Sequence, residues 1–458
     1  MNEVATADGE LAASNGQFRD LAQQDPACLR RATFAELDRP NPLLRYALQP
    51  WPTFIGRRTM GEVERVTTEV NRLIRRIPEQ TFRGDARRMA EYFSLDAAFI
   101  ASFLPPPNGI AGAIGRADLI LSRDGFQCIE FNIASSLGGW ESRIVSEMVL
   151  GIPAVGRIVR QLGVTFRQRD FVRELFTHCV QEALAAGLAD GEVNVAIGAR
   201  EPFPPAIEQL IARVLGTAYQ AVLREQAEPL RGALLLCYYP EVIAAGDELF
   251  HRGRRVHSLL EWHHHGSDPL VYRCFKAGTL NLYNGPASFV LSNKGCLALL
   301  SEEADAGRLA AGECEIVRRH IPWTRPVKAG ATLYRGETLD LPEFIAAHPE
   351  RLVLKKTNLG GGTDVVLGPA TGTAFWSETL RRALDEKDWV VQQRVESLPF
   401  LYQNGPEGCS PHDVIWGPFV FGDRFGGVSL RVQPKALDSV VNLHRGATVG
   451  IVLEAEEE

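Results

Sequence analysis

Four polar residues near position 120 stand at spacings that could bind a metal ion. Arg116 and Asp118 come before the turn signal Arg-Asp-Gly at 123–125, and Glu130 and Asn132 come after it. Because glycine adopts positive φ easily, this pattern predicts a β-hairpin. A register symmetric about the turn places Asp118 opposite Glu130 and Arg116 opposite Asn132. The strand period of two then puts all four side chains on one face.

Two carboxylates that face each other on paired strands repel one another unless a cation lies between them. Carboxylate and amide oxygens are hard ligands that suit Mg²⁺, which takes few protein groups and the oxygens of substrate phosphates. Asp118, Glu130 and Asn132 are therefore candidate Mg²⁺ ligands. The pattern is equally typical of an amphipathic hairpin with a solvated outer face, whose core face would carry Ala117, Leu119, Ile129 and Phe131.

A second stretch with useful chemistry lies at 351–368. A predicted strand ends in Lys355-Lys356, and a second strand follows a loop that holds Gly360, Gly361 and Gly362. Consecutive glycines let the backbone approach a ligand closely, so a lysine beside them suits a flap over a triphosphate. A mobile hairpin tip is the alternative. The stretch is not a Walker A loop, because the next element is a strand.

Three further positions carry side chains that could contact a nucleotide. Lys294 opens a predicted helix at 296–303 and could reach a phosphate, although a surface lysine is the simpler interpretation. Gln392 and Gln393 lie on a predicted strand at 389–395, where their amides could meet an adenine edge or simply face solvent. Arg431 lies near the end of the strand-rich segment 419–432.

The elements that must position these residues indicate an α/β (α+β) protein. The pattern predicts a disordered segment at 1–27, a helical region with the hairpin at 28–189, and a small α/β unit at 190–290, where strands and helices alternate. The flap-bearing region spans 291–395. Residues 396–458 add strands and end in an acidic tail from Glu454, which we expect to be solvated.

Composition excludes several classes of protein. The chain has 458 residues and a formal net charge of −7, which argues against a nucleic-acid partner or an acidic membrane surface. No apolar run is long enough to cross a membrane. The eight cysteines are scattered singly, without a Cys-x-x-Cys pair, which fits a reducing cytoplasm. The oligomeric state stays open.

The order of these motifs resembles a known family. Arg116-x-Asp118, Glu130-x-Asn132, Ser292-Asn293-Lys294, Lys355 with the glycine loop, Val391-Gln392-Gln393 and Gly427-Val-Ser-Leu-Arg431 follow one another as in the synthetase part of glutathionylspermidine synthase. That family belongs to the permuted ATP-grasp ligases. The resemblance implies an ATP-grasp-type fold, in which 190–290 is the small pre-ATP-grasp unit and 291–395 is the ATP-binding lid with its glycine flap.

The resemblance also implies roles for single residues. Asp118, Glu130 and Asn132 would hold two Mg²⁺ ions. Arg116 would contact the transferring phosphoryl group or the acyl oxygen, and Arg431 would contact the γ-phosphoryl group. Lysines would bind the ATP phosphates, and Gln392 or Gln393 would bind the adenine. The family has a proline after its lysine where this chain has Lys356, so the phosphate-binding lysines are Lys294 and either Lys355 or Lys356.

The activity implied by the resemblance is an ATP-dependent carboxylate–amine ligase that forms an amide through an acyl phosphate. Its partners would be a carboxylate, either a small molecule or a peptide, and an amine. One alternative is a ligase of the same chemistry that modifies peptides in a natural-product pathway. The other is a nucleotide-binding regulator without turnover, although facing carboxylates would have no use in it.

Overall fold

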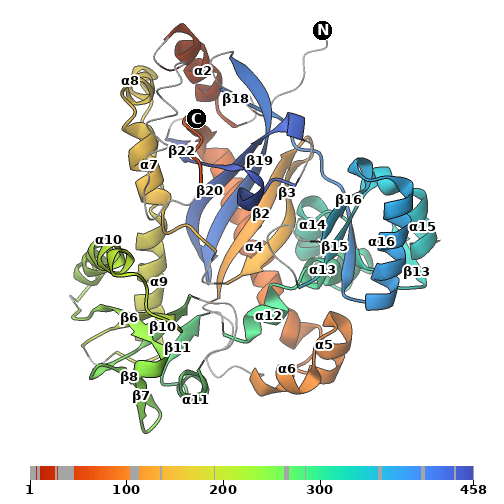
Figure 1. Cartoon of the computed structure of the whole chain (residues 1–458). Coiled ribbons are helices and arrows are strands. Elements are labelled where there is room, and N and C mark those ends of the chain that lie inside the picture. Colours follow the sequence, from red (N-terminus) through yellow and green to blue (C-terminus); the bar gives the residue numbers. More distant parts are fainter. Residues whose placement is uncertain are drawn as a thin grey trace.

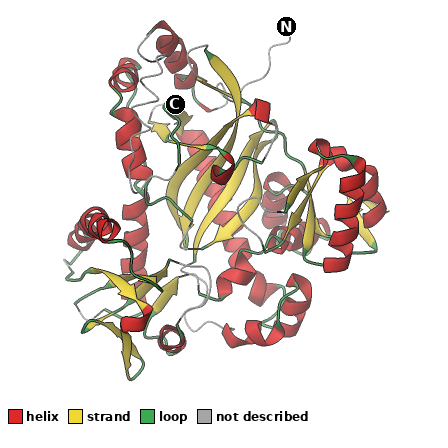
Figure 2. Ribbon diagram, in the orientation of Figure 1, coloured by secondary structure: helices red, strands yellow, loops and turns green. Residues whose placement is uncertain are grey.

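The structure of the protein is a computed structural model. It describes residues 7, 11–25, 28, 46–103, 113–134, 137–189, 191–228, 230–262, 268–283, 285–358, 364–403, 408–437 and 440–456. Helices and sheets are mixed throughout these residues (Figure 2), as predicted for an α/β protein. No helix among the described residues has both the length and the apolar character needed to cross a membrane.

A six-stranded antiparallel sheet lies at the centre of the molecule and carries the predicted hairpin (Figure 1). Its strands run in the order β21-β20-β19-β2-β3, and β18 pairs with β19. The strands are β2 (Ile114–Ser122), β3 (Gly125–Ile133), β18 (Phe400–Gln403), β19 (Cys409–Phe421), β20 (Arg424–Pro434) and β21 (Thr448–Gly450). The hairpin β2–β3 therefore lies beside strands from the far end of the chain.

A long helix, α4 (Arg57–Gln80), packs on the central sheet. Its apolar residues recur at helical spacing, and the buried ones are Val63, Val66, Val70, Leu73, Ile74 and Ile77. A polar contact fixes the helix as well, because the buried Asn71 side chain donates a hydrogen bond of 2.7 Å to the carbonyl oxygen of Gly422 in the β19–β20 turn. Arg75 forms an ion pair with the neighbouring Asp423.

A second antiparallel sheet lies at one side of the central sheet, within the region predicted as the lid, and we call it and its helices the lid unit (Figure 1). It contains β12 (Thr324–Pro326), β15 (Leu352–Lys356), β16 (Val365–Leu367) and β17 (Trp389–Gln393), together with α15 (Leu341–Ala347), α16 (Thr373–Glu386) and the hairpin β13 (Ala331–Tyr334)–β14 (Glu337–Asp340). These elements share a separate hydrophobic core around Trp376 and Trp389.

The lid unit is smaller than the predicted region 291–395. The helices α13 (Gly295–Asp305) and α14 (Ala311–His320) pack into the main hydrophobic core rather than into the lid core. Leu297, Leu300 and Val317 are their buried apolar contributions. The separately packed lid therefore begins after α14.

A small parallel sheet lies at the other side of the molecule (Figure 1). Its strand order is β11-β10-β5-β6, with β5 (Val195–Ala199), β6 (Leu234–Tyr238), β10 (Ser258–Glu261) and β11 (Asn281–Tyr283). Around it stand α9 (Phe171–Ala185), α10 (Pro205–Arg224), α11 (Pro269–Lys276) and the strands β7 (Val242–Ala245), β8 (Glu248–His251) and β9 (Arg254–Arg255).

The two ends of the described chain meet in a third sheet. β22 (Val452–Ala455) pairs in parallel with β1 (Thr53–Gly56) and antiparallel with β4 (Phe166–Arg167). The expectation of a solvated tail from Glu454 is wrong for Glu454 and Ala455, whereas Glu456 is exposed. Glu454 is buried in β22 and forms an ion pair of 2.5 Å with Arg167.

The N-terminal segment predicted as disordered contains a helix, α2 (Ser14–Gln24). Its Phe18 side chain is buried against Trp51 and Phe54, at 5.6 Å between ring centroids in both cases. The packing of one aromatic residue therefore orders a segment whose sequence lacks a helical pattern of apolar residues. The remaining helices are α5 (Ala86–Phe93), α6 (Ala97–Phe103), α7 (Ser142–Leu150), α8 (Pro153–Gln161) and α12 (Ala287–Leu291).

Candidate active site

The hairpin β2–β3 brings the predicted metal ligands together. Arg116 pairs with Asn132 and Asp118 pairs with Glu130 across the two strands. Both pairings are the ones predicted from the turn signal. Since opposed residues on paired strands share a face, the two carboxylates and the amide point to the same side of the sheet.

The register shifts by one residue beyond Asp118, where a β-bulge places Leu119 opposite Cys128. The extra residue, Ile129, lines a cavity instead of the core, and Cys128 is the buried residue. The prediction that Ile129 lies on the core face is therefore wrong, because a bulge reverses the alternation of sides from that point on.

Asp118 lies between two guanidinium groups. Its Oδ1 atom is 3.0 Å from Arg116 Nε and 2.5 Å from Arg431 Nη2, and Arg431 comes from β20. Burial by itself would raise the pKa of Asp118, but the two arginines outweigh burial and lower the pKa to about 2. Asp118 is therefore ionised at neutral pH, and it holds both guanidinium groups in place.

Two lysines stand near the second carboxylate, Glu130. Lys294 Nζ lies 3.3 Å from Glu130 Oε1. The start of α13 fixes its backbone, where Lys294 donates a hydrogen bond of 3.1 Å to the carbonyl oxygen of Thr357. Lys355 Nζ donates to the carbonyl oxygen of Ile129 at 3.1 Å, so the bulge supplies a partner for this lysine.

Lys355 is almost fully buried, and its ammonium group also donates to Gln392 Oε1 at 2.6 Å. Burial lowers the pKa of Lys355 to about 8, and the positive charge of Lys294 adds to this effect, while Glu130 opposes it. A phosphate group next to this lysine would favour the charged form further.

The neighbouring Lys356 faces away from the site. It forms ion pairs with Glu386 at 3.3 Å and Asp388 at 3.5 Å, both in the lid unit. Successive side chains of a strand alternate between faces, so β15 can present only one of the two lysines to the cavity. Lys355 is the lysine that lines it.

The two glutamines of β17 differ in the same way. Gln392 is buried and its amide is fully engaged, because it accepts from Lys355 and donates to Thr324 Oγ1 at 3.0 Å. Gln393 is partly exposed and begins the segment 393–397, which connects the lid unit to the central sheet. Gln392 therefore lies on the same face of the sheet as Lys355 and Val353, whereas Gln393 lies on the other face at the edge of the cavity.

These side chains surround a cavity of about 800 Å³ between the central sheet and the lid sheet. We call it the first cavity. Its polar lining includes Arg116, Asp118, Glu130, Asn132, Lys355, Gln392, Gln393 and Arg431. Lys294 does not line the cavity, and its contact with the site is the ion pair with Glu130. The predicted flap residues Gly360, Gly361 and Gly362 lie outside the described residues.

Two lining residues, Ser429 and Asn442, were not singled out as site residues from the sequence. Ser429 stands two residues before Arg431 on β20, and that period of two would have been the signal for it. A loop with Gly138 and Gly139 lies beside Arg116, whose Nη1 atom donates to the carbonyl oxygen of Leu137 at 2.6 Å. Asn442 also lines the cavity, and no local pattern marks it.

The donor set can be tested against a metal ion. Within the described residues no group of three His, Cys, Asp or Glu side chains converges on one point. The site offers two carboxylates and the amide of Asn132, all of them oxygen donors. Such a set fits Mg²⁺ when phosphate oxygens complete the coordination, and it does not fit a self-sufficient structural metal site.

This arrangement of two sheets around a polar cavity is consistent with the predicted ATP-grasp-type fold. No protein-family model and no curated protein matches the chain. Over its whole length it is similar to a glutathione synthetase-like effector from Globodera pallida, with a TM-score of 0.56 and 11% identity over 99% of each chain.

A more remote similarity connects the chain to a candidate gamma-glutamylcysteine synthetase from Methylobacillus flagellatus. The TM-score is 0.42 at 11% identity, over 84% of this chain and 88% of the other. The first of these structures is named for a glutathione synthetase-like protein and not for glutathionylspermidine synthase. The finer resemblance to that family therefore stays a prediction.

Proposed function

We propose that the protein is an ATP-dependent ligase that joins a carboxylate to an amine as an amide. The observation that carries the proposal is the convergence, in the first cavity, of two carboxylates, an amide, a buried lysine and two arginines from three separated segments of the chain. Phosphoryl transfer depends on alignment and charge neutralisation more than on covalent help from protein, and this set of residues supplies both.

The nucleotide would lie between the two sheets. Val353, Val365 and Leu367 give the lid side of the first cavity an apolar surface suited to a base. Gln392, on the same face as Lys355, or Gln393, at the edge of the cavity, would contact the adenine edge. The triphosphate would then extend toward Lys355 and Glu130.

Asp118, Glu130 and Asn132 would hold Mg²⁺ against the phosphates, and Lys294 would act beside Glu130. The ion would supply charge neutralisation for the γ-phosphoryl group. In this structure Lys294 and the two arginines neutralise these carboxylates. Asp118 is therefore kept ionised, and Glu130 lies opposite it on the hairpin, where a divalent cation could bind both.

In the reaction, a carboxylate oxygen of the acid attacks the γ-phosphorus and ADP leaves with the bridging oxygen. The amine then attacks the carbonyl carbon of the acyl phosphate, phosphate leaves, and the amine loses a proton to phosphate or solvent. Arg116 and Arg431 would contact the transferring group, where planar guanidinium donors stabilise the charge that develops on its oxygens.

The test is Mg²⁺-dependent ADP release with pools of carboxylates and amines, including peptides, followed by mass spectrometry. We expect ADP release that requires both an acid and an amine, and a product lighter than their sum by one water. ADP release with an acid alone at the full rate, or a product without an amide, would contradict the ligase. Nucleotide binding without turnover in every pool would favour the regulator.

A further inference from the structure

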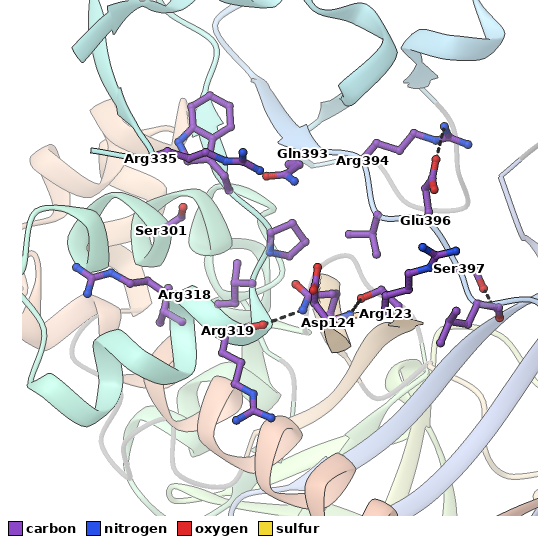
Figure 3. A pocket seen from close by; sticks show the side chains of 18 of the residues that line it. Arg123, Asp124, Ser301, Arg318, Arg319, Arg335, Gln393, Arg394, Glu396 and Ser397 are labelled. Carbon is purple, nitrogen blue, oxygen red and sulfur yellow. Dashed lines mark hydrogen bonds and ion pairs between the residues drawn. The ribbon is translucent and has the colours of Figure 1, made fainter. Parts of the chain in front are cut away.

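A second cavity of about 920 Å³ lies against the same connecting segment, 393–397, that lines the first cavity. The turn of the β2–β3 hairpin, the end of α14 and the β13–β14 turn form its other walls. Nothing in the proposed ligase reaction uses this space. Figure 3 shows Arg335 and Gln393 on one side of it, with Arg123 and Asp124 on the other.

The floor of the second cavity is apolar. It contains Ile321, Pro322 and Leu398, which are buried, and the partly buried Val395 and Trp323. The Trp323 ring is held by Tyr334 and Phe344, at 5.2 Å and 5.7 Å between centroids, and its Nε1 atom donates to the carbonyl oxygen of Leu333. A rigid apolar floor of this size suits the body of a small ligand.

The rim of the second cavity is cationic, although the chain as a whole has a net charge of −7. Six cationic side chains and three carboxylates line this cavity. One of the carboxylates, that of Asp305, is already paired with Arg325. The cationic residues are Arg123, Arg318, Arg319, Arg335, Arg394 and Lys435.

Several of these cations are already engaged. Arg319 lies 3.7 Å from Glu62, Arg394 lies 3.6 Å from Glu396, and Lys435 lies 3.8 Å from Asp413. Within the described part of the chain, Arg123 and Arg335 have no carboxylate within ion-pair distance. The guanidinium group of Arg335 stacks on Tyr334 at 5.3 Å, which fixes it at the edge of the apolar floor.

We propose that the second cavity is a binding site for an amphipathic anion, that is, a small molecule with an apolar body and a carboxylate, sulfonate or phosphate group. The apolar body would lie on Trp323 and Val395, and the anionic group would bind Arg123 and Arg335 from the two sides. Guanidinium groups bind such oxyanions through paired hydrogen bonds, which makes Arg123 and Arg335 specific for this class of ligand.

Anilinonaphthalene sulfonate, a fluorescent amphipathic anion, tests the proposal with the full chain. We expect saturable binding of one molecule per chain. Removing either guanidinium, as Arg123→Gln or Arg335→Gln, should weaken binding by about tenfold or more, since each removes a charge-assisted hydrogen bond. Both residues lie at exposed turn tips, and an unchanged thermal midpoint would show that the variants fold.

The position of the probe can be read from energy transfer. The chain has seven tryptophans, and Trp323 in the floor would be the nearest donor, so Trp323→Phe should remove most of the tryptophan-to-probe transfer. Decanoate should displace the probe, whereas the uncharged decanol should do so far less. Arg213→Gln, an exposed arginine on α10, is the matched control and should bind the probe normally.

Two results would overturn the proposal. One is probe binding that the Arg123 and Arg335 variants leave unchanged. The other is binding that is lost in Lys355→Met, a variant of the first cavity, but kept in Arg335→Gln, which would place the anion in the first cavity. The test requires no turnover, so the ligase proposal can fail while the second cavity still binds its ligand.

Discussion

At the scale of single residues, Asp118 organises the candidate site. It is the common partner of Arg116 and Arg431, and the two arginines come from strands that lie far apart in the sequence. A buried ionised carboxylate is stable only when it is paired. The ligand that approaches Asp118 therefore meets guanidinium donors that are already oriented.

A substitution of Arg431 tests this arrangement. Arg431→Ala should lower the rate of ADP release by about 100- to 1000-fold, which is the usual cost of losing one donor to transition-state charge. Arg424→Ala is the matched control, because Arg424 lies on the same strand and pairs with Glu174 away from the cavity. Near-normal turnover in the Arg431 variant would remove this residue from the site.

The buried ammonium group of Lys355 makes nucleotide binding depend on pH. Its folded-state pKa of about 8 lies below the ordinary value of 10.5, so the native state loses this proton first as pH rises. Above about pH 8, ATP affinity should fall by up to about tenfold per pH unit, because phosphates bind the protonated form. Calorimetric titration with ATP from about pH 7 to pH 9.5 would measure it.

Arginine cannot lose its proton in this range. Lys355→Arg should therefore abolish the decline, while Lys356→Arg should keep it, since Lys356 pairs outside the cavity and its pKa is raised. The same pKa shift predicts that stability rises with pH between about 8 and 10.5, where the unfolded chain binds the extra proton. If ATP affinity still declines with pH in Lys355→Arg, another titrating group causes the decline.

The pairing of the four hairpin residues could be predicted from the sequence because a glycine turn and a period of two fix the register locally. The bulge at Ile129 could not be predicted, because the sequence around it has the same pattern as a regular strand. The choice between Lys355 and Lys356 was also open, because only the partner strands decide which face of β15 meets the cavity.

At the scale of elements, α4 ties the central sheet together through its contact with the β19–β20 turn. Asn71→Ala would leave the buried carbonyl oxygen of Gly422 without its donor, which should cost about 1–3 kcal/mol of unfolding free energy. Urea unfolding measures the change. Thr68→Ala on the same helix, where the hydroxyl bonds only within α4, should change stability by less than about 0.5 kcal/mol.

An equal loss in the two helix variants would mean that the contact with Gly422 contributes nothing beyond the loss of a side chain from α4. The amphipathic pattern of α4 could be predicted from the sequence, because its apolar residues recur every three or four positions. The assignment of α13 and α14 to the main core could not be predicted from the sequence. Both helices are adjacent in sequence to the lid, and only tertiary packing shows which core they join.

At the scale of the whole molecule, β22 joins residues near the two ends of the described chain. Leu453 in this strand is buried, so Leu453→Ala should lower the free energy of unfolding by about 2–5 kcal/mol. The same substitution at the exposed Leu184 on α9 is the control and should have an effect within about 0.5 kcal/mol. Similar losses at both positions would mean that β22 adds little to stability.

Pairings of this range leave no local mark in a sequence. The strand β1 has only four residues, and its partner lies at the opposite end of the chain. The mixed α/β class could be predicted from alternating patterns, whereas the third sheet and the helix α2 that packs near it depend on contacts between distant segments.

The pairing of β1 with β22 also sets the order of events on the ribosome. β1 ends at Gly56 and its partner begins at Val452, so β1 leaves the ribosome almost the whole length of the chain before β22 exists. At the usual rates of translation that interval is roughly 20 to 80 s. Phe54 and Ile55, fully buried in the finished protein, stay without this partner until then. The pairing of β1 must therefore wait for most of the chain to be made, and a chaperone that shields β1 would act during that interval.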